Sequence, residues 1–308
     1  MRYSIHVYKS NCLQVSNQEF LLLSLPVLEY SGAQENKRVL PTCIAVHDLS
    51  CHAKSSLTIV IPILEAMGVE VSPLPTALLS TQTDGYDGYS FDDQTEAMER
   101  IISHWESLGV SARALYSGFL GSVEQIALVE RLMPLISRGY SESGTDASPV
   151  ILVDPVMGDG GQLYGPISPD MVPALRRLVA QASVITPNTT EACLLCGRPW
   201  QESWTTMDIM KLLDCLRTLT NAHIVITGIS LQDDDERHYA VAYSDAVSGE
   251  QGIYQHDREK ASLPGSGDMF ASLCCGFLLQ GGSFSSAVMH SSDMTALAVR
   301  RTLQAGYE

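Results

Sequence analysis

A glycine-rich turn that ends in an acid, Gly265-Ser266-Gly267-Asp268, directly precedes an apolar run over 269–279. The run is apolar nearly all round, which predicts a buried helix. Its N-terminus attracts anions through its N–H groups and dipole, and the glycines allow a tight turn in front of it. Asp268 could take a proton from a hydroxyl group while this anion hole holds the phosphoryl group under attack. The alternative is a plain loop whose aspartate caps a core helix.

Two further acids, Asp154 and Asp159, follow the strongly apolar run 150–153. That run predicts a strand, so both acids lie at a bend just after its end. Mg²⁺ prefers carboxylates, waters and phosphate oxygens, and such a bend suits it. The alternative is that Asp154 caps a turn and Asp159 is solvated.

Polar residues also follow two later strands. Asn188 and Glu191 stand three residues apart, which fits a capping box at a helix start. The same pair could hold a metal-bound water near phosphates. Thr227-Gly228 could let a nucleotide approach the backbone or could simply form a turn.

Predicted strands and helices alternate along almost the whole chain, which indicates an α/β domain with a mostly parallel central sheet flanked by helices. We expect strands at 42–47, 69–74, 112–117, 150–153, 183–186 and 224–226, an antiparallel pair near 238–243 and 252–256, and helices at 57–67, 92–108, 122–136, 169–180, 188–196, 206–219, 268–280 and 284–302. Polar or glycine residues follow five of these strands, and ligands bind at that edge of such sheets.

The stretch 76–91 is rich in Thr, Gly and Tyr and alternates only weakly. It predicts a short β-hairpin or flap that stands apart from the main sheet. Residues 1–38 show no clean period and end in a polar run. They are interpreted as an N-terminal extension, poorly ordered or loosely packed, in front of a single domain over 39–308.

The 308 residues carry 19 Lys and Arg against 35 Asp and Glu, a net charge of −16. Such an acidic chain argues against general binding of nucleic acid or anionic membranes. Eight cysteines without a regular framework fit a reducing, cytoplasmic setting, and Cys193 and Cys196 are interpreted as core cysteines rather than half a zinc site. No apolar run approaches the ~20 residues of a membrane span.

Taken together, four pieces over about 42–302 resemble the pyridoxal (pyridoxine, pyridoxamine) kinases of the ribokinase-like superfamily. They are Ser80-Thr81-Gln82-Thr83-Asp84-Gly85-Tyr86, Tyr116-Ser117-Gly118-Phe119-Leu120-Gly121-Ser122, Asp154-Pro155-Val156-Met157-Gly158-Asp159 and Gly265-Ser266-Gly267-Asp268. Pro187-Asn188-Thr189-Thr190-Glu191 is shared more widely in that superfamily.

The resemblance implies ATP-dependent phosphorylation of the 5′-hydroxymethyl group of a vitamin B6 vitamer, under a small β flap. Asp268 would be the base, and Gly265, Ser266 and Gly267 the anion hole. The other implied roles are substrate binding by Asp48, Thr83 and Phe119, nucleotide binding by Asp159, Thr186, Asn188, Glu191, Thr227 and Gly228, and Mg²⁺ binding by Asp154 and Glu191. Such kinases are usually homodimers and often need a monovalent cation such as K⁺.

The chain departs from the family pattern in three places. Ser266 stands where threonine is common, Phe119 where tyrosine is frequent, and the loop 50–54 is poorer in glycine. Two alternatives therefore stay open. One is a hydroxymethylpyrimidine kinase of the same fold, although those enzymes often carry cysteine at the position of Asp268. The other is a non-catalytic relative that binds pyridoxal phosphate or a nucleotide.

Overall fold

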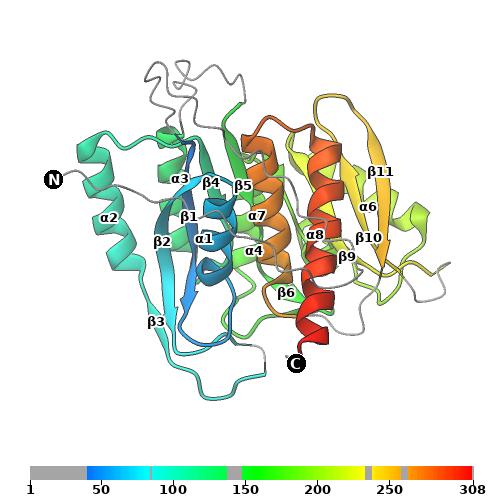
Figure 1. The fold of residues 1–308 in the computed structure, drawn as a ribbon, viewed down its shortest axis with the longest axis horizontal. Coiled ribbons are helices and arrows are strands. Elements are labelled where there is room, and N and C mark those ends of the chain that lie inside the picture. The colour runs from blue at the N-terminus through cyan, green and yellow to red at the C-terminus, as the bar shows by residue number, and fades with distance from the viewer. Residues whose placement is uncertain (1–39, 84, 137–147, 233–237, 258–262, 307–308) are drawn as a thin grey trace, which may run out of the picture. The chain divides into compact units, whose positions relative to one another are not determined.

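The computed structural model describes residues 40–83, 85–136, 148–232, 238–257 and 263–306. Within these residues a nine-stranded sheet forms the middle layer, with the strand order β11-β10-β9-β8-β5-β4-β1-β2-β3 (Figure 1). The parallel strands are β1 (Thr42–Ser50), β2 (Glu70–Leu79), β4 (Ala114–Ser117), β5 (Val150–Val153), β8 (Val184–Ile185) and β9 (His223–Ile229). Antiparallel strands extend both edges: β3 (Phe91–Asp93), β10 (His238–Ser244) and β11 (Gln251–Asp257).

Helices cover both faces of this sheet (Figure 1). One face carries α1 (Leu57–Ala66), α7 (Ser266–Leu279) and α8 (Phe284–Gln304). The other carries α2 (Thr95–Leu108), α3 (Val123–Leu132), α4 (Met171–Val179), α5 (Thr189–Cys196) and α6 (Thr206–Leu219). A short 3₁₀ turn, Met133–Leu135, follows α3.

Strand β1 shows why the central sheet needs both helix layers. Cys43 and Ala45 pack into the core under α1 and α7, whereas Ile44 and Val46 pack into the core under α2 and α3. Successive side chains of a strand point to opposite faces, so an unbroken apolar run fits only a strand that is buried on both sides. The apolar run 42–47 therefore forms a central strand, as the sequence predicts.

The predicted alternation of strands and helices is confirmed, including the antiparallel pair β10 and β11. Two local predictions are wrong. The hairpin over 76–91 does not stand apart, because β2 continues to Leu79 and pairs with β3 at the edge of the main sheet. The helix expected from residue 92 begins only at Thr95, because Asp92 and Asp93 belong to β3.

A second, two-stranded sheet was not expected from the sequence. It consists of β6 (Gly158–Asp159) and β7 (Gln162–Leu163), which form a tight antiparallel turn shortly after β5. Both β3 and β6 lie at the bottom of Figure 1, the end to which the parallel strands run.

The expected extension over 1–38 lies outside the described residues, as do residues 137–147 and the acidic residues 233–236. The extension therefore stays a prediction. In the part of the chain that is described, no helix is both long and apolar enough to cross a bilayer.

Candidate active site

A cavity of about 820 Å³ opens at the carboxyl ends of the parallel strands. Every site residue predicted from the sequence lines it: Asp48, Thr83, Phe119, Asp154, Asp159, Thr186, Asn188, Glu191, Thr227, Gly228, Gly265, Ser266, Gly267 and Asp268. Residues from the ends of β1, β5, β8 and β9 meet there because neighbouring parallel strands end at the same edge of the sheet. Segments that lie more than 200 residues apart in the sequence therefore share one space.

Asp268 lies in the first turn of α7, near the middle of this cavity. Its Oδ2 accepts a hydrogen bond of 2.8 Å from the backbone N–H of Ser56, and its Oδ1 lies 3.8 Å from Nδ1 of His47. The side chain is only 14% exposed, and burial raises its pKa from 3.8 to about 7. A carboxylate with that pKa suits proton abstraction near neutral pH.

The glycine turn brings the N-terminus of α7 to the cavity. Gly265 is the N-cap residue with φ 84°, a left-handed conformation that favours glycine. A Cβ at Gly265 would lie 3.2 Å from the carbonyl oxygen of Lys54 and 3.2 Å from Ile59, so the turn packs closely on the start of α1. The first N–H groups of a helix have no partner within that helix, which makes this end of α7 a suitable anion site.

Asp48 marks the end of the cavity near β1 to β3. It is 6% exposed and accepts hydrogen bonds from the hydroxyl groups of Ser50, at 3.0 Å, and Ser56, at 2.5 Å. Burial raises its pKa, against the opposing effect of the two serine hydroxyls. A polar anchor of this kind can orient a small ring that carries hydroxyl groups.

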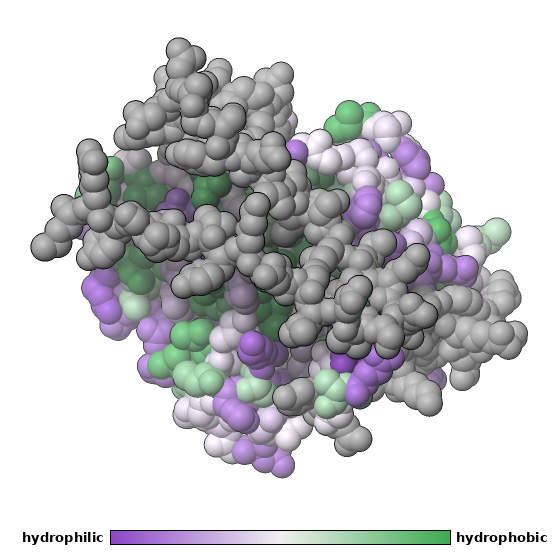
Figure 2. Space-filling model, in the orientation of Figure 1, coloured by the Kyte–Doolittle hydropathy of each residue, from purple (hydrophilic) through white to green (hydrophobic). Residues whose placement is uncertain are grey.

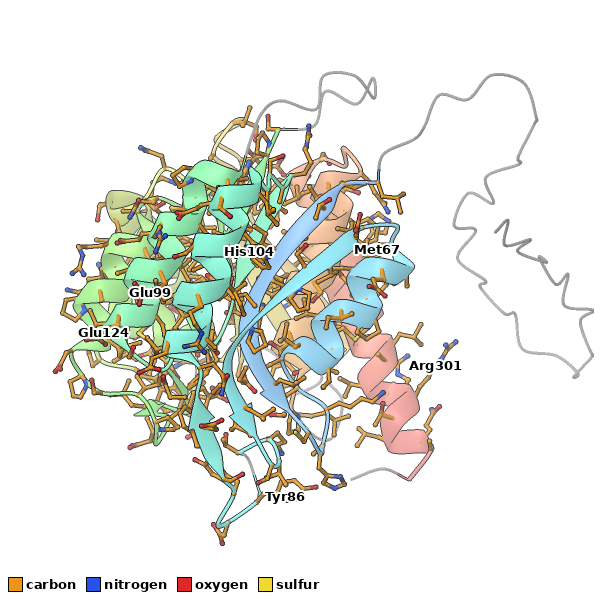
Figure 3. All side chains as sticks on the ribbon, turned by 90° about the vertical axis from the view of Figure 1, so that its left-hand side faces the viewer. Met67, Tyr86, Glu99, His104, Glu124 and Arg301 are labelled. Carbon is orange, nitrogen blue, oxygen red and sulfur yellow. The ribbon has the colours of Figure 1, made fainter. Side chains whose placement is uncertain are left out.

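Aromatic side chains lie at the same end. The rings of Phe91 and Phe119 meet edge to face at 6.2 Å. The loop between β2 and β3 carries Tyr86, whose ring lies 5.9 Å from that of His52 (Figure 3). This loop thus reaches across to the segment between β1 and α1 and borders the cavity. Met67, which follows the last residue of α1, lies at the end of that helix away from this loop (Figure 3).

Asn188 and Glu191 form the capping box that the sequence analysis offered as one alternative. The Glu191 carboxylate accepts from the N–H of Asn188 at 2.8 Å and from the N–H of Met157 at 3.0 Å, and the Asn188 amide donates to the carbonyl of Gly158 at 2.8 Å. The start of α5 therefore holds the β6–β7 turn, which carries Asp159.

Asp154 and Glu191 are both buried next to these contacts. Burial raises the pKa of Asp154, and it raises that of Glu191 to about 8. Buried acids without a neutralising partner suit a cation. The described residues contain no cluster of three or more His, Cys, Asp or Glu side chains arranged for a metal. A Mg²⁺ ion here would thus take most of its ligands from water and phosphate, as that ion prefers.

The far end of the cavity lies over β9 to β11 and α8. Thr227 and Gly228 form a bulge in β9, where the pairing register with β10 shifts between Ala240 and Ala242. The neighbouring lining residues were not expected from the sequence: Tyr239, Val241, His256, Ala296 and Val299. Most of these are ordinary core or strand residues with no distinctive spacing, so only the packing of α8 on β10 and β11 reveals them.

Ser56 is a further lining residue that was not expected from the sequence. Its hydroxyl contacts Asp48 and its N–H contacts Asp268. Serine is common in loops, and no sequence pattern distinguishes this one from its neighbours at 50 and 55.

Comparison with known proteins agrees with this geometry. Residues 64–308 match the family model described as phosphomethylpyrimidine kinase. The pyridoxine/pyridoxal/pyridoxamine kinase of Bordetella avium is 27% identical over 256 residues, 78% of each chain. A Saccharomyces cerevisiae protein named as a candidate pyridoxal kinase is 26% identical over 63% of this chain, and the match spans 62% of that relative's length.

Two solved structures share the fold. A Bacteroides thetaiotaomicron protein named as a candidate phosphomethylpyrimidine kinase, crystallised with pyridoxal, is 35% identical with a TM-score of 0.75, over 82% of this chain and 85% of that one. The pyridoxal kinase of Lactobacillus plantarum is 30% identical with a TM-score of 0.77, over 87% and 91%.

Proposed function

The chain belongs to the phosphomethylpyrimidine kinase family, of the ribokinase-like fold, and from that membership we propose that it phosphorylates the 5′-hydroxymethyl group of a vitamin B6 vitamer with ATP. The observation that carries the proposal is the order of groups along the cavity. Asp48, Phe91 and Phe119 stand at the β1–β3 end, Thr227 and Gly228 at the β9–β11 end, and Asp268 with the start of α7 between them.

Each group has a place in a phosphoryl transfer. The aromatic end and Asp48 would orient the pyridine ring, so that its hydroxymethyl group faces Asp268. Asp268 would accept the hydroxyl proton, while the backbone of Gly265, Ser266 and Gly267 stabilises charge on the transferred group. Mg²⁺ held near Asp154 and Glu191 would supply neutralising charge for the triphosphate. Positioning and charge stabilisation provide most of the catalysis in this reaction class.

The pyrimidine kinase alternative shares the fold, and the family model carries that name. Three observations favour the vitamer. The 35% identical Bacteroides protein was crystallised with pyridoxal, and the 30% identical Lactobacillus protein is named a pyridoxal kinase. Asp268 is also present as a buried base with a pKa of about 7, where the pyrimidine enzymes often carry cysteine. The non-catalytic alternative has no use for such a base.

A coupled ADP-release assay tests the proposal. Mg-ATP and K⁺ are supplied with pyridoxal, pyridoxine, pyridoxamine or hydroxymethylpyrimidine, each alone, and Asp268→Asn serves as the control for contaminating kinases. We expect turnover on at least one vitamer and a fall of about a thousandfold or more in the variant. Turnover on the pyrimidine alone would move the chain to the other substrate. No turnover in folded protein that binds ATP would support the non-catalytic relative.

Homodimer formation and a K⁺ requirement are part of the same proposal. Helix α1 supports the dimer, because it is apolar nearly all round but buries only Leu57, Val60 and Leu64 against the sheet. Its Ile61 and Ile63 stay partly exposed and Pro62 is exposed. Where the described residues are visible on the face that carries α1, α7 and α8, apolar surface lies among polar residues (Figure 2). Sedimentation of the protein and replacement of K⁺ by tetramethylammonium in the assay test these two points.

A further inference from the structure

Ser56 contacts both of the acids that the proposed function places around the acceptor hydroxyl. Its hydroxyl donates to Oδ1 of Asp48 at 2.5 Å, and its backbone N–H donates to Oδ2 of Asp268 at 2.8 Å. We propose that Ser56 is a positioning residue that fixes the substrate-orienting Asp48 and the base Asp268 relative to each other. This inference rests on the proposed function, because it concerns the same two carboxylates.

The backbone of Ser56 is held in an unusual conformation. Its φ of 50° and ψ of −127° lie in a region that glycine visits readily and residues with a Cβ rarely adopt. Such outliers persist only where the surrounding contacts impose them, and they gather at functional sites. Here the strained peptide is the one whose N–H reaches Asp268.

The hydroxyl of Ser56 does not serve the helix that follows it. Ser56 is the N-cap residue of α1, but its side chain makes no capping hydrogen bond. The side chain that stabilises this helix start is Thr58, whose Oγ1 accepts from the N–H of Ser55 at 3.1 Å and donates to its carbonyl at 2.8 Å. The Ser56 hydroxyl is bound to Asp48 instead, and the residue as a whole is only 8% exposed.

These contacts join three elements that are far apart in the chain. Asp48 belongs to β1, Ser56 precedes α1, and Asp268 lies in α7, 212 residues after Ser56. The bond to Asp48 anchors the Ser56 side chain, and this anchor keeps the peptide at positive φ, so that the N–H stays aimed at Asp268. Without the hydroxyl, a residue with a Cβ gains by relaxing to negative φ, and the N–H then leaves the base.

Three variants separate this role from a structural one. Ser56→Ala removes the anchor and retains the Cβ. Ser56→Gly removes the anchor but tolerates positive φ without strain. Thr58→Ala is the matched control, because it loosens the start of α1 and touches neither acid.

We expect Ser56→Ala to lower kcat about tenfold or more and to raise the KM for the vitamer, since a misplaced base and an unanchored Asp48 both cost rate. Ser56→Gly should raise the vitamer KM several-fold but keep kcat within about threefold of the parent. Thr58→Ala should lower the melting temperature and leave both constants near the parent values. A kcat in Ser56→Ala equal to the parent's, or a Ser56→Gly variant as slow as Ser56→Ala, would overturn the proposal.

A readout that needs no turnover keeps this inference separate from the proposed function. The amide proton of Ser56 donates to a carboxylate, so its NMR signal should lie downfield and move when Asp268 becomes Asn, with little change in Thr58→Ala. In Ser56→Gly the same amide should stay downfield. An amide of residue 56 that does not respond to Asp268→Asn would refute the contact, even if vitamer phosphorylation is observed. If the amide signal responds to Asp268→Asn but the protein has no kinase activity, the contact between Ser56 and Asp268 stands and only the assigned reaction is rejected.

Discussion

Asp268 is a carboxylate whose surroundings raise its pKa into the physiological range. Desolvation by burial is the largest cause, the N–H of Ser56 opposes it, and the charge of Asp48 adds to it. His47, 3.8 Å away, does not supply a compensating positive charge, because complete burial lowers its pKa to about 3 and leaves the ring neutral. The proposed base therefore has an acid, Asp48, and a neutral ring, His47, beside it, and we expect its own protonation to govern activity near neutral pH.

The first prediction at this scale concerns the pH profile. A general base works in its ionised form, so kcat/KM for the vitamer should fall tenfold for each pH unit below about 7 and level off above it. Steady-state rates between pH 5.5 and 9 at constant ionic strength measure this, with each vitamer's own ionisation determined separately. The residual rate of Asp268→Asn should not show this fall below about pH 7. An acid limb near pH 4, the ordinary range of aspartate, would show that Asp268 is not the titrating group.

At the scale of elements, the β6–β7 turn and the start of α5 form one unit. The Asn188 amide binds the carbonyl of Gly158, and the Thr190 hydroxyl accepts from the N–H of Gly161 at 3.0 Å. Gly158 itself has no room for a side chain, since a Cβ there would lie 2.0 Å from the carbonyl oxygen of Gln162. The position of Asp159 thus depends on a glycine that closes a very tight turn.

Gly158→Ala should therefore open this turn. We expect a lower melting temperature, by about 2–4 °C for each kcal/mol lost, and a KM for Mg-ATP that rises more than the KM for the vitamer. The matched variant is Gly165→Ala, which adds the same methyl group where nothing lies within 4 Å and should keep the melting temperature. Equal melting temperatures for the two variants would contradict the close packing at Gly158.

The elements also show what the sequence could predict. Unbroken apolar runs with polar residues just after them predicted both the parallel strands and their shared edge, because a strand buried on two faces leaves little freedom for another interpretation. The edge pairing of β2 with β3 was missed, since weak alternation does not say which strand will be the partner. Ser56 was missed because its partners Asp48 and Asp268 are supplied by other parts of the fold.

At the scale of the whole molecule, negative charge gathers where the ligand is expected. The chain has a net charge of −16; Asp48, Asp154 and Glu191 are buried around one cavity, and Asp268, with a side chain that is 14% exposed, lines the same cavity. Burial raises the pKa of all four. In the unfolded chain these acids would titrate near pH 4, so the folded protein binds more protons than the unfolded one between about pH 4 and pH 8.

The unliganded protein should consequently lose stability as pH rises. A group whose folded pKa is raised contributes its full stabilisation below its unfolded pKa, and this contribution disappears as pH rises through the folded value, about 7 for Asp268 and about 8 for Glu191. We expect the melting temperature to fall by several degrees between pH 6 and pH 9, which corresponds to a few kcal/mol at about 2–4 °C per kcal/mol. Calorimetry in buffers of matched ionic strength measures it. Surface carboxylates are already ionised at pH 6, so their repulsion changes little over this window.

Mg-ATP should remove much of this fall in melting temperature with rising pH, because its cation offsets the buried negative charge that destabilises the fold at high pH. Ligand binding also stabilises only the folded state. In the unliganded protein, Asp268→Asn should make the melting temperature depend less on pH, since it deletes one of the four acids without changing the size of the side chain. The variant should therefore melt above the parent at pH 9 and close to it at pH 5. A parent melting temperature that rises from pH 6 to pH 9 would mean that the acids around the cavity are already neutralised within the fold, and it would contradict a cavity prepared for a cation and a triphosphate.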